Sequence, residues 1–94
     1  MSSREYSGIR YDDPRLQAEF ERLLAEVEAC ERSRTPVQES HRNAERAYED
    51  GEISERQFRT VDDQYISANN KIAAAKKNVD QFLQMNKNYR VEKL

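Results

Sequence analysis

Apolar residues recur along this chain at alternating intervals of three and four, in two stripes that meet at Gly51. The first stripe runs from Leu16 to Tyr48, and the second runs from Phe58 to Tyr89. This spacing is the heptad pattern of a coiled-coil seam. Because one stripe lies on each side of a glycine, the pattern predicts an all-α fold, an antiparallel helical hairpin or coiled coil of two long arms.

The start of the second arm is well marked. Ser54 and Gln57 have the spacing of a capping box, in which the two residues satisfy each other's backbone N–H groups. Gly51 suits the left-handed residue that often closes a preceding helix. We therefore expect a turn at 50–53 and a second arm at 54–90.

The first arm is preceded by a segment without helical period. Residues 1–12 contain a glycine and no heptad, and we interpret them as an extended tail. Asp13 then supplies a helix N-cap, and Pro14 follows at the first helical position, where a missing N–H costs nothing. The sequence thus predicts one helical-hairpin domain at 13–94, with its first arm at 13–50.

A proline inside the first arm leaves two arrangements open. Pro36 removes one helical hydrogen bond and crowds the preceding turn. The heptad phase continues through it, which favours a kinked but continuous arm. Thr35 and Gln38 could instead cap a new helix, which would break the arm. The broken arm would give a three-helix arrangement, with helices at 13–33, 36–50 and 54–90.

The turn also predicts how the arms are aligned. A turn centred on Gly51 pairs positions whose residue numbers sum to 102, such as Phe20 with Phe82. The main competitor is a slip of one heptad, for which the numbers sum to 109.

Charge agrees with this antiparallel pairing. The chain has 16 basic and 18 acidic residues, for a net charge of −2. Residues 1–31 carry four basic and eight acidic groups, whereas residues 71–94 carry six basic and two. These stretches lie side by side in the hairpin, where opposite charges flank the seam. The small net charge gives no general attraction to nucleic acid or anionic lipid, so nucleic acid is not the expected partner.

The open end of the hairpin has more apolar residues than a two-residue seam needs. Leu24 and Leu83 widen the stripe beyond what the opposite arm covers. The surplus consists of Leu23, Leu24, Phe82, Leu83, Met85, Tyr89, Val91 and Leu94. The tail folding back, a second copy or another protein could cover it, and we expect a homodimer that buries this end. The predicted partner-binding residues are Tyr6, Ile9, Tyr11, Leu24, Leu83, Met85 and Tyr89.

No residue pattern predicts catalysis. His41 is the single histidine, and we interpret it as a seam-edge imidazole reaching solvent. Cys30, the single cysteine, has the position of a small buried hydrophobe. Phosphate-binding loops, calcium loops and nucleophile motifs are missing from the sequence, so we expect no enzyme, no cofactor and no metal.

We therefore predict a non-enzymatic protein–protein interaction module, such as a small adaptor, inhibitor or assembly factor. The alternative is a nucleic-acid-associated accessory factor that uses the basic second arm. We expect no membrane span and no signal peptide, and hence a cytoplasmic protein. Export by a route that needs no signal sequence would leave no such trace.

Overall fold

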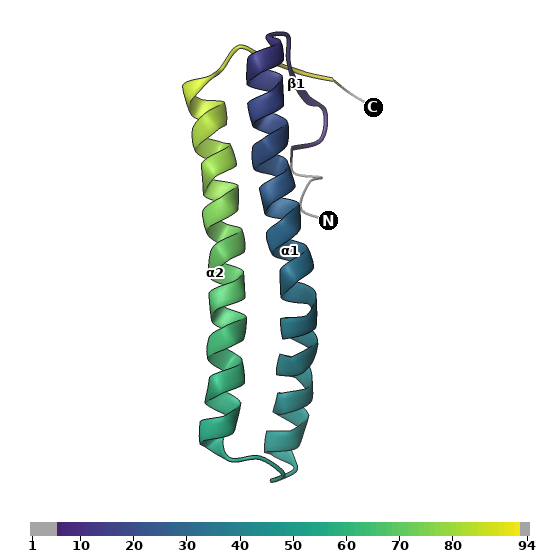
Figure 1. The fold of residues 1–94 in the computed structure, drawn as a ribbon, viewed down its shortest axis with the longest axis vertical. Helices are drawn as coiled ribbons and strands as arrows, with labels where there is room; N and C mark the ends of the chain where they lie inside the picture. Colours follow the sequence, from purple (N-terminus) through teal and green to yellow (C-terminus); the bar gives the residue numbers. More distant parts are fainter. Residues whose placement is uncertain (1–5, 93–94) are drawn as a thin grey trace.

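The computed structural model describes residues 6–92 of the chain. Two long helices, α1 at Pro14–Glu49 and α2 at Glu55–Met85, pack side by side and antiparallel (Figure 1). Two short strands, β1 at Ile9–Tyr11 and β2 at Tyr89–Val91, lie at the end opposite the turn. The molecule is a rod with extents of 57 × 24 × 16 Å. The predicted antiparallel helical hairpin is confirmed.

Helix α1 is continuous through Pro36, so of the two arrangements the unbroken arm is the one observed. Asp13 caps its start by accepting a hydrogen bond from the backbone N–H of Arg15 at 2.8 Å. Pro14 follows at the first helical position, where it needs no hydrogen bond. Pro36 is exposed, so its ring faces solvent rather than the second helix.

The turn between the helices closes with Gly51 in the left-handed conformation, as predicted. Gly51 has φ +74°, and its N–H bonds to the carbonyl of Tyr48 at 3.1 Å. The N–H of Glu52 bonds to the carbonyl of Ala47 at 2.7 Å, which completes a Schellman motif. The capping box then starts α2, with hydrogen bonds of 3.1 Å to the Ser54 hydroxyl and 2.8 Å to the Gln57 side chain.

The register is the one in which residue numbers sum to about 102. The rings of Phe20 and Phe82 stack with centroids 6.4 Å apart. Farther along, Arg34 donates a hydrogen bond to Asn69 at 3.0 Å. The one-heptad slip is therefore not the observed pairing.

Helix α2 ends at Met85, earlier than the predicted boundary at 90. Asn86 leaves the helix with φ −128° and ψ 81°, and its side chain bonds back to the carbonyl of Phe82 at 3.1 Å. The side chain of asparagine competes for backbone groups, and here its bond to the Phe82 carbonyl favours the end of the helix. Tyr89 lies in strand β2 instead of in a helix, and its side chain still packs against the hydrophobic core.

The two strands were not foreseen. β1 pairs antiparallel with β2, with Ile9 opposite Val91 and Tyr11 opposite Tyr89. Residues 9–11 of the expected tail are extended, but as a strand that lies against the helices and joins the segment before α1 to the segment after α2. Residues 1–5 of that tail lie outside the described part of the chain.

The core is concentrated at the end of the rod that carries the strands. Phe20, Val27 and Val79 are the largest fully buried side chains. Tyr11 makes edge contacts with the rings of Phe20 and Phe82, at centroid distances of 5.8 and 5.4 Å. This aromatic packing closes the hairpin at its open end.

Candidate interaction surfaces

The open end is built by the segment that precedes α1. The phenol of Tyr6 donates a hydrogen bond to the carboxylate of Asp80 at 3.0 Å. The phenol of Tyr11 donates to the main-chain carbonyl of Asn86 at 2.6 Å. These bonds allow two tyrosines to be buried, because each hydroxyl has an acceptor inside the structure.

Gly8 allows the segment to reach β2. Its φ is +86°, and a Cβ built on it would come within 2.3 Å of the carbonyl oxygen of Glu92. The same stretch contains a hydrogen bond from the N–H of Glu92 to the carbonyl of Gly8. Only glycine combines this left-handed conformation with so close an approach.

The predicted partner-binding residues come together at this end, but in different environments. Tyr6 and Tyr11 are 6% and 5% exposed and belong to the core cluster. Four others pack against that cluster and are half-buried: Ile9, Leu24, Leu83 and Tyr89. Met85 is 83% exposed. Of the three coverings that the sequence left open, the structure shows the tail folding back.

Apolar surface remains after this fold-back. Met85 ends α2, and Val91 of β2 is 67% exposed. Val91 was among the surplus apolar residues of the open end, but it was not among the predicted partner-binding residues. The strand pairing that fixes its position could not be foreseen from the sequence. Leu94, another member of the surplus, lies outside the described residues.

Charges at the open end are largely paired. Arg10 and Arg90 are directly opposite each other in the two strands. Arg90 lies 3.0 Å from Asp12 and 3.6 Å from Glu92, which offset this like-charge pair. One cation of the basic second arm is thus engaged within the chain. Burial raises the pKa of Tyr11, and the neighbouring phenol of Tyr89 raises it further.

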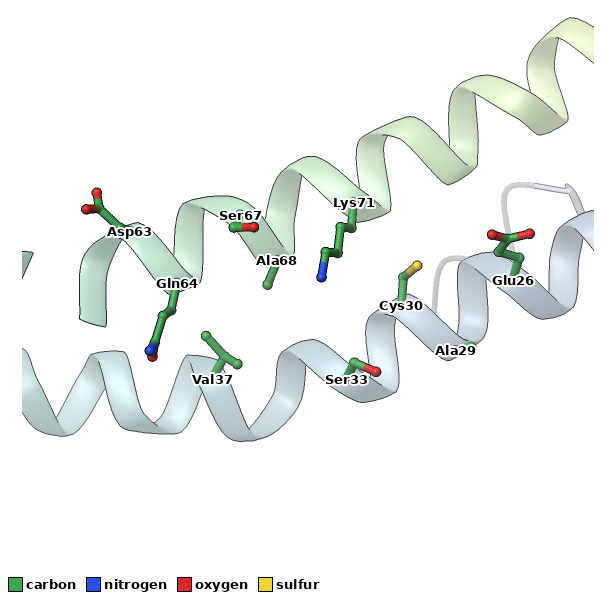
Figure 2. Close-up of a pocket in the computed structure, with 10 residues that line it drawn as sticks. All are labelled: Glu26, Ala29, Cys30, Ser33, Val37, Asp63, Gln64, Ser67, Ala68 and Lys71. Atoms are coloured by element: carbon green, nitrogen blue, oxygen red, sulfur yellow. The ribbon is translucent and has the colours of Figure 1, made fainter. Parts of the chain in front are cut away.

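A second candidate surface is a groove of about 640 Å³ halfway along the rod, between α1 and α2 (Figure 2). Small residues line both walls: Ala29, Cys30 and Ser33 from α1, and Ser67 and Ala68 from α2. Val37 adds an apolar side chain, and Glu26, Asp63, Gln64 and Lys71 form the charged and polar rim. The heptad pattern did not predict this groove, which opens beside small residues near the seam.

The groove exists because polar seam residues turn to the other side of the hairpin. Arg34 reaches Asn69, and His41 Nε2 lies 2.8 Å from Asp62. Asn69 and Asp62 flank the seam on the side opposite Lys71 of the groove rim, as their heptad positions require. One face of the hairpin is therefore bridged by polar contacts, while the walls of the groove on the other face are formed mainly by small side chains.

His41 is more enclosed than expected. Its side chain is 13% exposed, and Nδ1 lies 3.0 Å from the carboxylate of Glu45. Its ring stacks on Tyr65 with centroids 4.5 Å apart. Asp62 and Glu45 face opposite ring nitrogens and so do not converge on one point. Within residues 6–92, no group of three or more His, Cys, Asp or Glu side chains is arranged to hold a metal ion.

Cys30 is half-buried, whereas its heptad position predicted a small buried hydrophobe. The prediction was wrong because the groove opens beside it. Its thiol is a natural reporter of whether the groove is covered.

Comparisons with protein families, curated proteins and solved structures find no match to this chain. Within the described residues, neither helix has the length and apolar character needed to cross a membrane. The surfaces themselves must therefore support any functional proposal.

Proposed function

We propose that this protein is a non-enzymatic protein–protein interaction module, a small adaptor, inhibitor or assembly factor, that binds a protein partner through its open end. The observation that carries the proposal is the apolar surface left exposed there by Met85 and Val91. Exposed apolar surface of this kind commonly marks an interface.

The surroundings of these residues suit binding. Met85 has an unbranched, adaptable side chain, which fits irregular partner surfaces. Leu83 and Tyr89, each two residues before Met85 and Val91 respectively, are half-buried and pack on the core cluster, so they offer anchored apolar contact. Aromatic side chains held in this way are frequent binding hot spots. The partner would meet a surface already ordered by the strand pair.

Substitutions at the open end test the proposal. Asp in place of both Met85 and Val91 should weaken capture of the partner from the native host about tenfold or more. Both side chains are outside the core, so circular dichroism should be unchanged. Ile66→Asp is the matched control, since Ile66 is 48% exposed and lies midway along α2.

A second comparison separates protein binding from the polyanion alternative. Lys77→Glu with Lys87→Glu removes exposed cations of the basic arm without touching the core. If this pair abolishes binding while the Met85 and Val91 variant binds normally, the open-end proposal is wrong. Binding that also weakens steeply with salt would then favour nucleic acid. We further propose a cytoplasmic location, which fractionation of the host tests.

A further inference from the structure

The half of the seam nearest the turn is incompletely covered. Val37, Val61, Tyr65 and Ala68 are seam residues, yet all are only half-buried. On one face, the Arg34 and His41 bridges close the seam. On the other face lies the groove, where Val37 and Ala68 leave apolar surface uncovered.

The rim of the groove on α2 carries two charges of opposite sign. Asp63, Ser67 and Lys71 are spaced by four residues and form one inclined ridge on the helix. Within residues 6–92, neither Asp63 nor Lys71 has a hydrogen bond or ion pair, whereas Glu26 on the α1 rim lies 4.0 Å from Arg22. Figure 2 shows Lys71 extending towards α1 and Asp63 on the side of α2 away from it.

We propose that a second copy of this chain docks on the groove, with the α2 helices of the two copies crossing at Ser67. A two-fold axis through Ser67 brings Asp63 of each copy opposite Lys71 of the other. The contact is self-complementary, because the same two unpaired charges are satisfied twice. The surface is separate from the open end, so it stands independently of the proposed partner site.

The geometry of the ridge supports this docking. Packing the i, i+4 ridges of two helices together crosses them at about 50°, the commonest class of helix packing. The ridge runs towards α1 at its Lys71 end. Packing along this ridge would place the second copy's α2 diagonally across the groove, towards Cys30. Small side chains at Ser67, Ala29 and Ser33 permit the close backbone approach that this crossing needs.

Charge swaps test the pairing with purified protein alone. Wild type should sediment as a dimer at tens of micromolar, and Asp63→Lys or Lys71→Asp alone should each weaken dimerisation about tenfold. The double variant, and an equal mixture of the two single variants, should restore it, since each then presents opposite charges across the axis. Arg42→Glu and Glu49→Lys are matched controls, because both residues are exposed charges away from the groove.

The Cys30 thiol reports the location of the contact. Its reaction with a bulky maleimide should slow as wild type is concentrated into the dimer range, and should not slow for Lys71→Asp. Three results would overturn the proposal: a wild-type monomer at all concentrations, a dimer that neither single variant weakens, or a dimer whose Cys30 reacts as fast as in the monomer. If wild type is a monomer, a second copy does not occupy the groove.

Discussion

The phenol of Tyr11 and the main-chain carbonyl of Asn86 share a hydrogen bond of 2.6 Å, which joins the strand before α1 to the residue at which α2 stops. Through this bond the last turn of one helix depends on a segment outside both helices. The bond also places a neutral phenol in a buried site, where its ionisation is disfavoured.

Alkaline pH should therefore loosen the open end. The pKa of Tyr11 is raised by burial and by Tyr89. The folded state binds this proton more tightly than the unfolded state. The stabilisation is complete below the usual tyrosine pKa of about 10 and is lost as pH rises from there through the higher pKa of the folded protein. Tyr11→Phe should flatten this alkaline fall in urea-unfolding titrations, and Tyr48→Phe should leave it unchanged because Tyr48 is exposed.

At neutral pH, Tyr11→Phe should lower the free energy of unfolding by about 1 kcal/mol. The variant keeps the aromatic packing but leaves the Asn86 carbonyl without its donor. Chemical unfolding followed by circular dichroism measures this difference. No loss of stability would mean that water replaces the phenol without cost.

Gly8→Ala should free the N-terminal segment without melting the helices. The added methyl would meet the Glu92 carbonyl at 2.3 Å, and φ +86° is strained for alanine. We expect faster proteolysis near residues 6–11. Gly51→Ala is the control: its Cβ meets nothing within 4 Å, so it should cost only about 1 kcal/mol of conformational strain and leave those residues protected.

Pro36→Ala should stabilise the protein, by up to about 3 kcal/mol. The helix already passes through this position, so alanine restores the missing backbone donor to a geometry that exists. A rise in the thermal midpoint, compared with Ser40→Ala as a nearby exposed control, would verify it. A drop instead would show that Pro36 shapes a bend on which the hairpin depends.

Ile72→Cys should form a disulfide with Cys30 under mild oxidation. The two positions are paired in the observed register, whose residue numbers sum to about 102. Val79→Cys lies about two helical turns away and should not crosslink. Gel mobility with and without reductant distinguishes the two, and the opposite pattern would indicate a one-heptad slip in solution.

The hairpin, its turn and its register were predictable because they rest on strong local signals. The heptad stripes, Gly51 and the Ser54 capping box each specify backbone geometry within a few residues. The end of α2 was less predictable, since Tyr89 fits the heptad as well as a strand. What decided it was the asparagine at 86 and the pairing with β1.

The strands and the groove needed information that no local pattern contains. A strand of three residues has too little alternation to be recognised, and β1 and β2 are separated by nearly the whole chain. The groove depends on the direction in which Arg34 and His41 leave the seam, which their partners Asn69 and Asp62 decide. Sequence spacing gives a residue's position on a helix but not the side to which a long polar side chain turns.

The strand pair also determines how the molecule would respond to mechanical force. The outer residues of the pair, Ile9 and Val91, are those nearest to the chain ends. A pull applied between residues 8 and 92 would load the ladder one rung at a time, in peeling rather than in shear. The ladder would therefore open at low force, from Ile9 inward to Tyr11, and only then would tension reach the helices.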